Sequence, residues 1–213
     1  MYIIDFDDTI FNTRGANGFK EVRIKVLENL GISKDLYKGT YLEARDAEPI
    51  GYNNLKHAQV LSKHGFDKDK ILQALEKTTS PEILKTFLFD DTIGFLEKMK
   101  EFNKPMVLLS FGDAEFQTLK VVQAGLDKYV NQVMIVQEPK SIATAQLIKD
   151  QNPKDVWFIN NRVDETLQVK EKIDNINYLL KKSEDIDLEE YKQSNLPYFE
   201  TLTKIYEHIR TNQ

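Results

Sequence analysis

The sequence contains no cysteine among its 213 residues. This absence excludes disulfide bonds, thiolate catalysis and metal sites built from sulfur ligands, and it is compatible with a reducing cytoplasm. Histidines are scarce, and His57, His64 and His208 lack metal-ligand spacing, so each is expected to be a surface or packing residue. Long apolar runs are also missing. Runs such as Met106 to Leu109 are far shorter than the ~20 residues of a membrane span, and the acidic N-terminus lacks a signal-peptide pattern.

The chain also has no excess of basic residues, since its net charge is -5 and its isoelectric point is about 5.4. The basic patch that nucleic-acid binding requires is therefore not expected. Hydrophobic residues make up 41% of the chain and charged residues 30%, which is typical of a soluble globular protein. These properties predict a cytoplasmic protein with neither a nucleic-acid nor a membrane partner. No pattern in the sequence indicates an oligomeric state.

The hydrophobic pattern divides the chain into two parts. Residues 14–88 show helical periodicity throughout, without the compact apolar runs of buried strands. From Asp90 onward, helical patterns alternate with short apolar runs at Met106–Ser110, Val133–Val136 and Val156–Asn160. This alternation predicts an α/β fold with a doubly wound, mainly parallel sheet. The opening run Tyr2–Ile4 belongs to the same sheet, so the helical segment is an insertion that covers the carboxyl edge of the sheet.

Other local patterns complete this prediction. Ser33 and Asp67 are expected to cap helices of the inserted segment. Toward the C-terminus, Ile176–Leu180 indicates an edge strand, the charged stretch 181–190 a solvated loop, and Pro197–Arg210 an amphipathic helix.

Three carboxylates follow the opening apolar run, at Asp5, Asp7 and Asp8. Acids cannot continue into a buried core, so they should lie at the carboxyl end of the strand, where open α/β sheets bind ligands. A like-charged pair about 4 Å apart costs ~4 kcal/mol at an effective dielectric constant near 20, which a bound cation would relieve. Hard oxygen ligands suit magnesium. A solvated acidic turn that caps a helix is the alternative interpretation, and spacing alone does not separate the two.

The segment Asp5-Phe6-Asp7-Asp8-Thr9-Ile10 resembles the D-x-D-x-T-[LVI] first motif of the haloacid dehalogenase-like phosphohydrolase superfamily. The resemblance implies a Rossmann-like core domain formed by residues 1–13 and 89–213, with a helical cap domain formed by residues 14–88. It also implies that the remaining motifs of the superfamily follow later core strands.

Two of those motifs have matching residues that would bind phosphate. Ser110 ends the strand predicted at Met106–Ser110, as the Ser or Thr of the second motif does. Lys140, after Pro139 and before a helix, is similar to the lysine of the third motif, which offsets the charge of nucleophile and phosphate. The alternatives are a serine in an ordinary βα turn and a solvated lysine.

The fourth motif departs from the superfamily pattern of an acidic pair. Asn160 occupies the place of the first acid and Asp164 that of the second. The resemblance implies that magnesium is held by Asp5, Asp7, Asn160 and Asp164. Since asparagine adds no charge, weaker metal binding, or direct binding by Asp164, is expected. A simple Asn160-Asn161 turn in an impaired enzyme is the alternative.

The resemblance implies a magnesium-dependent phosphatase for a small phosphorylated metabolite. Asp5 would be the nucleophile that forms an aspartyl-phosphate, and Asp7 would protonate the leaving alcohol and then activate water. A phosphotransferase or mutase, and a binding or regulatory protein without turnover, are the alternatives. Dehalogenation ranks lower, because dehalogenases of the superfamily lack the second aspartate.

Four further residues carry open interpretations. Asp8 stands where many relatives have glycine, and it is expected to adjust local charge or to bind a backbone N–H group. Arg14, Arg23 and Arg45 lie in or near the helical segment. They are interpreted first as surface arginines and second as contacts for an anionic part of the substrate.

Overall fold

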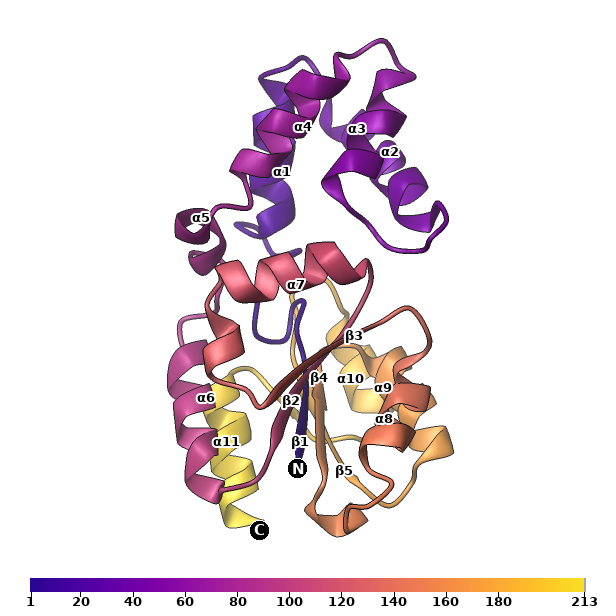
Figure 1. Ribbon diagram of the computed structural model, residues 1–213. Helices are drawn as coiled ribbons and strands as arrows, with labels where there is room; N and C mark the ends of the chain where they lie inside the picture. Colours follow the sequence, from indigo (N-terminus) through magenta and orange to yellow (C-terminus); the bar gives the residue numbers. More distant parts are fainter. Residues whose placement is uncertain (213) are drawn as a thin grey trace.

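In residues 1–212, which the computed structural model describes, six parallel strands form one sheet in the order β3-β2-β1-β4-β5-β6 (Figure 1). The predicted α/β fold class with a parallel sheet is therefore confirmed. The strands are β1 (Tyr2–Asp5), β2 (Met106–Phe111), β3 (Gln132–Val136), β4 (Trp157–Asn160), β5 (Asn177–Lys181) and β6 (Tyr198–Phe199).

The first strand lies at the centre of the sheet, between β2 and β4. Its register pairs Asp5 with Leu109 and Ile4 with Ile159. Tyr2, Ile3 and Ile4 are fully buried, as expected for a parallel strand that is covered on both faces. The carboxyl ends of β1, β2 and β4 consequently meet at one edge.

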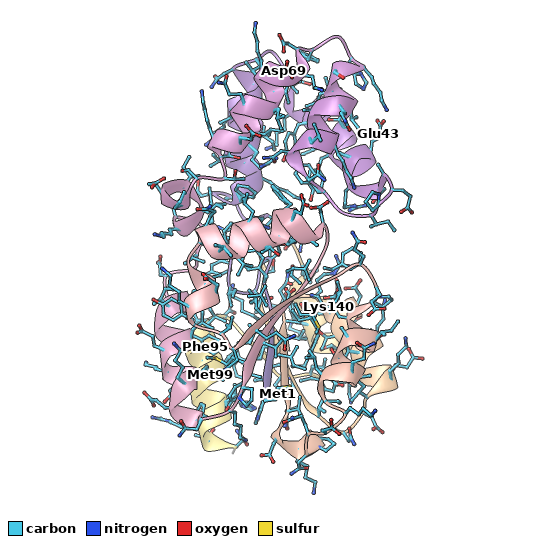
Figure 2. The ribbon with its side chains drawn as sticks, viewed as in Figure 1. Met1, Glu43, Asp69, Phe95, Met99 and Lys140 are labelled. Carbon is cyan, nitrogen blue, oxygen red and sulfur yellow. The ribbon has the colours of Figure 1, made fainter. Side chains whose placement is uncertain are left out.

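Helices cover both faces of the sheet (Figure 1). Successive side chains of a strand point to opposite faces, so Tyr2 and Ile4 pack in one apolar cluster and Ile3 in another. The first cluster includes Phe95 and Met99, which are labelled in Figure 2. The helices beside the sheet that contribute to this cluster are α6 (Thr92–Met99), α7 (Ala114–Gln123) and α11 (Leu202–Thr211), and those that contribute to the other cluster are α8 (Lys140–Leu147), α9 (Val163–Lys172) and α10 (Leu188–Gln193).

The segment of residues 14–88, which is inserted between β1 and α6, contains five helices and lies beyond α7 in Figure 1. Its cluster of buried apolar residues, including Leu27, Leu61 and Leu75, is separate from the two clusters at the sheet. Ser33 and Asp67 accept hydrogen bonds from backbone N–H groups in the first turns that follow them, which confirms both predicted caps. The helices are α1 (Phe19–Glu28), α2 (Lys34–Asp46), α3 (Asn54–Ser62), α4 (Lys68–Lys77) and α5 (Pro81–Lys85).

Three local predictions were wrong near the C-terminus. The strand predicted at Ile176–Leu180 is not at the edge, because β6 pairs with its last residues. The predicted terminal helix begins only at Leu202, since Tyr198 and Phe199 form that short strand. The predicted loop 181–190 contains the start of α10, which Asp187 caps and which the buried Tyr191 anchors. Separately, no helix in residues 1–212 has the length and apolar character needed to cross a membrane.

Candidate active site

Five of the six predicted site residues line a single cavity of about 330 Å³ at the carboxyl edge of the sheet. Ser110 follows the register partner of Asp5 by one residue, so both side chains stand at adjacent strand ends. The side chains of Asp5, Ser110 and Lys140 are almost completely buried. The five predicted residues that line the cavity are Asp5, Asp7, Ser110, Lys140 and Asp164.

Asp5 is held by two donors in a desolvated environment. The Thr9 hydroxyl donates a hydrogen bond of 2.8 Å to Oδ2, and the Lys140 ammonium forms a short ion pair with Oδ1. Burial raises the pKa of Asp5 to about 6, although the positive charge of Lys140 opposes this rise. The carboxylate is thus oriented, poorly solvated and largely ionised near neutral pH.

Lys140 bridges Asp5 and a second acid, Glu165, which the sequence analysis missed. Its Nζ lies 2.8 Å from Glu165 Oε2, and the Asn160 amide donates a 2.8 Å hydrogen bond to the same oxygen. Burial alone would lower the pKa of Lys140, but the two carboxylates outweigh it and raise that pKa. Lys140 therefore stays charged and neutralises part of the site. Figure 2 labels Lys140 within the core.

Asn160 and Asp164, the predicted metal ligands of the fourth motif, are both engaged elsewhere in this structure. The Asn160 carbonyl oxygen accepts a 2.9 Å hydrogen bond from the Asn161 backbone N–H. The Asp164 carboxylate pairs with Arg162 at 2.5 Å, and its side chain is 52% exposed. Asp164 still lines the cavity beside Glu165. Their assignment as metal ligands stays a prediction.

Asn161 contributes an unsatisfied donor to the same cavity. The residue is 1% exposed, and its amide nitrogen has no hydrogen-bond partner. A buried donor without an acceptor costs about 1–3 kcal/mol. An anionic oxygen bound within hydrogen-bond distance of this nitrogen would satisfy it. The sequence analysis treated Asn161 only as a turn residue, and its position next to Asn160 was the one available signal.

Asp7 makes strong contacts that the sequence analysis also missed. Lys120 Nζ lies 2.5 Å from Asp7 Oδ1, Gln117 donates a 2.8 Å hydrogen bond to Oδ2, and Thr13 contributes a third bond. Burial would raise the pKa of Asp7, but these partners, Lys120 above all, lower it to about 2. Asp7 is consequently ionised and held in place from α7.

Lys120 is itself enclosed by aromatic rings. Its side chain is 3% exposed, and Nζ lies 4.7 Å from the ring centre of Phe6 and 5.0 Å from that of Phe11. Cation–π attraction and the Asp7 carboxylate together compensate for burial of the ammonium.

Asp8 has a structural role that agrees with its expected bond to the backbone. Its φ angle is 60°, a left-handed conformation that favours glycine, asparagine or aspartate. Its Oδ1 accepts 2.8 Å hydrogen bonds from the backbone N–H groups of Thr13 and Arg14. The turn that presents Asp7 is thereby fixed, and Asp8 also pairs with the Arg14 side chain.

The loop between α2 and α3 contacts the core beside the site. Asn53 donates a 2.9 Å hydrogen bond to Asp113, and Gln137 donates one of 2.9 Å to the carbonyl of Ile50. Gly51 packs so closely that a Cβ atom would lie 2.2 Å from the Asp113 nitrogen, so only glycine fits. The helical segment therefore closes over this edge of the sheet.

A second cavity, of about 200 Å³, lies between the helical segment and the core. It shares Asp7, Arg14 and Phe111 with the first cavity, so the two adjoin. Arg23 and Arg45 also line it. Arg23 is only 1% exposed, so its first interpretation as a surface arginine was wrong.

No known protein-family model matches the sequence, and no curated protein matches it. Solved structures, by contrast, match nearly the whole chain. A protein of Burkholderia xenovorans provisionally described as a haloacid dehalogenase-like hydrolase has a TM-score of 0.74 and 16% identity, covering 97% of this chain and 94% of its own. One of Thermotoga maritima provisionally described as a beta-phosphoglucomutase has a TM-score of 0.69 and 12% identity, covering 100% and 99%.

The L-2-haloacid dehalogenase of Xanthobacter autotrophicus is also similar, with a TM-score of 0.63 and 14% identity, covering 98% of this chain and 97% of the dehalogenase. Each of the three matches covers nearly the full length of both chains. The chain therefore has the haloacid dehalogenase-like fold, as the resemblance of the first motif predicted.

Proposed function

We propose that this protein is a magnesium-dependent phosphatase that hydrolyses a small phosphorylated metabolite through an aspartyl-phosphate. The observation that supports this proposal most is the buried Asp5 carboxylate, held by Thr9 and Lys140 at the edge of a cavity with an unsatisfied donor on Asn161. Such a carboxylate is a suitable nucleophile, and the surrounding donors suit the oxygens of a phosphoryl group.

The donor set fits magnesium. In residues 1–212, no three acidic or histidine side chains gather into a preformed metal cage. Magnesium does not need one, since one or two carboxylates with phosphate and water usually complete its shell. Asp5 would supply one carboxylate and either Asp164 or Glu165 the other, with the Asp7 backbone carbonyl and the Asn160 side-chain oxygen as further ligands. The bound ion would screen the negative charge of Asp5 from that of the substrate.

In the first step, an Asp5 oxygen forms a bond to phosphorus while the bond from phosphorus to the ester oxygen breaks. Ser110, Lys140 and Asn161 would bind the transferring oxygens. Asp7 would supply the proton for the leaving alcohol. Lys120 keeps the pKa of Asp7 near 2, so protonation requires the repulsion of an incoming phosphate dianion to raise that pKa.

In the second step, water attacks the phosphorus of the aspartyl-phosphate, and the bond to the Asp5 oxygen breaks. Asp7 accepts a proton from the attacking water, a role that its position beside the cavity suits. Contact of the helical segment with the core at Gly51 and Asn53 would limit the access of other water molecules.

Turnover of 4-nitrophenyl phosphate with and without magnesium tests the proposal. We expect nitrophenol release well above the uncatalysed rate in the presence of magnesium and its loss after chelation with EDTA. Release that continues unchanged in EDTA would argue against the metal, and no release by a folded protein would argue against a phosphatase.

Asn160→Asp is expected to strengthen magnesium binding by about tenfold, because it adds a carboxylate beside Glu165. Without the metal, repulsion between the two acids should lower the free energy of unfolding by about 1 kcal/mol. Calorimetric titration with magnesium measures the first effect and thermal unfolding the second. Asn29→Asp, an exposed change in the helical segment, is the control. Unchanged affinity would remove Asn160 from the metal shell.

Hydrolysis at carbon without a metal is a second candidate function. It is favoured by the position of the Lys140 ammonium between Asp5 and Glu165, where it already offsets their charge. One of the similar structures is an L-2-haloacid dehalogenase. This candidate ranks second because the chain has Asp7, the second aspartate of the first motif, which dehalogenases of the superfamily lack. Halide release from 2-haloacids in EDTA, with no turnover of aryl phosphate, would make it the better description.

A further inference from the structure

The cavity between the helical segment and the core has an excess of positive charge. Its lining contains five cationic and three acidic side chains, which are Arg14, Lys20, Arg23, Arg45 and Lys120, and Asp7, Asp8 and Asp113. Three of the cations have carboxylate partners, since Arg14 pairs with Asp8, Lys120 with Asp7 and Arg45 with Asp46. Arg23 and Lys20 form no ion pair with any acid in residues 1–212.

Arg23 is a buried charge surrounded by neutral groups. Its guanidinium donates hydrogen bonds to Thr78 at 3.1 Å, to Asn54 at 2.7 Å and to the Tyr52 hydroxyl. These are three bonds for a group that has five N–H donors. A buried charge without a counterion is costly and is normally paired. The neutral partners orient the guanidinium but leave its charge available to a ligand.

A hydrogen-bonded relay fixes the orientation of Arg23. The Tyr52 hydroxyl accepts from Arg23 and lies 2.9 Å from Nδ1 of His57, whose Nε2 lies 2.9 Å from the Thr40 hydroxyl. Burial, aided by the positive charge of Arg23, lowers the pKa of His57 to about 3. The imidazole is therefore neutral and adds no second positive charge beside Arg23. This arrangement preorganises Arg23 at little entropic cost to binding.

Two further side chains that line the cavity, Tyr37 and Lys20, have groups that an anion could bind. The Tyr37 residue is 2% exposed, and no hydrogen bond of standard geometry satisfies its hydroxyl, although it lies near Arg23. Lys20 Nζ lies 4.1 Å from the ring centre of Tyr41. Burial and the nearby Arg14 lower the pKa of Lys20 to about 8, so it remains mostly charged at neutral pH.

We infer that this cavity is a subsite for a second anionic group, so that the substrate is a phosphate ester with a distal carboxylate or phosphate. Arg23 and Lys20 would bind the distal anion, and Tyr37 would donate a hydrogen bond to it. The shared walls at Asp7 and Phe111 connect this subsite with the cavity of Asp5. The inference rests on one part of the proposed function, namely that the reacting phosphate binds at Asp5.

The test compares a homologous series of ω-carboxyalkyl phosphates and α,ω-bisphosphates with methyl-terminated alkyl phosphates of the same length. For the wild-type protein we expect kcat/KM to favour the substrates with a distal anion by about tenfold or more at the chain length that spans the two cavities. The anion that gives the larger preference identifies the distal group. This measurement requires no variant, so it does not depend on the folding of a substituted chain.

Arg23→Gln should abolish that preference while changing the turnover of methyl-terminated substrates much less. Arg210→Gln, on α11 and outside the cavity, is the matched control and should retain the preference. If Arg23 only holds α1 to the Tyr52–Asn54 segment and Thr78, Arg23→Gln will reduce turnover of both substrate types equally. That outcome, or a wild-type protein without preference at any length, would overturn the inference.

Binding of the corresponding phosphonates separates this inference from the proposed function. Calorimetry on the wild-type protein should show tighter binding of ω-carboxyalkylphosphonates than of alkylphosphonates, with the difference lost in Arg23→Gln. If this difference is present but no phosphate ester is hydrolysed, the subsite is supported and the phosphatase proposal fails. If esters are hydrolysed but neither rates nor binding respond to the distal anion, the subsite fails and the phosphatase proposal is unaffected.

Discussion

Asp5→Asn is expected to lower kcat for 4-nitrophenyl phosphate by about 10³-fold or more, because an amide oxygen is a poor nucleophile towards phosphorus. The substitution retains the size of the side chain and an oxygen that can accept from Thr9. Steady-state rates and a phosphate-release assay measure the effect. Asp150→Asn, which changes an exposed aspartate, is the control and should leave kcat unaffected.

Unfolding measurements can show that Asp5→Asn loses activity because the nucleophile is removed and not because the protein is less stable. Burial raises the pKa of Asp5 to about 6 from an ordinary value of 3.8. When the pKa of an acid is higher in the folded state than in the unfolded state, its ionisation destabilises the folded protein. The cost begins as pH rises past the pKa of the unfolded state and is complete above the pKa of the folded state, here about 6. The neutral amide avoids this cost, so Asp5→Asn should be at least as stable as the wild type at pH 8. Retention of most activity would show that Asp5 is not the nucleophile.

The fold could be predicted where burial determines the sequence pattern. Parallel strands covered on both faces need continuous apolar residues, which made β2 and β4 recognisable. The short strand β6 carries no such pattern, because its Tyr198 and Phe199 are also compatible with the start of the amphipathic helix that follows. A two-residue strand forms only when the neighbouring strand is already in place, which is a tertiary effect.

The site residues that could be predicted are those whose position in the sequence relative to a predicted strand is recognisable. Asp5, Ser110 and Lys140 were found because each stands at a recognisable point relative to a strand end. Lys120 was missed because 113 residues separate it from Asp7, and a lysine on an amphipathic helix normally faces solvent. Glu165 was missed for a related reason, since motif spacing favoured its neighbour Asp164 and only the packing of α8 against α9 brings Glu165 to Lys140.

Lys120→Met is expected to lower the free energy of unfolding by roughly 3 kcal/mol at pH 7, because it leaves the Asp7 carboxylate without its counterion. Methionine should pack against Phe6 and Phe11, so the effect reports the lost charge more than lost contacts. Denaturant unfolding measures the change. Lys104→Met, which breaks the surface pair with Asp155, is the control and should cost less than about 1 kcal/mol.

The pH dependence of this difference identifies its cause. Lys120 holds the pKa of Asp7 at about 2, below the ordinary 3.8, so the pair stabilises the wild type above pH 4 and this contribution is lost as pH falls towards 2. In Lys120→Met, only the hydrogen bonds from Thr13 and Gln117 oppose burial, so the pKa of Asp7 should rise. The difference between the two proteins should therefore shrink on acidification. Adding Asp7→Asn should recover most of the lost stability at pH 7, and a double variant as unstable as Lys120→Met alone would refute the ion-pair explanation.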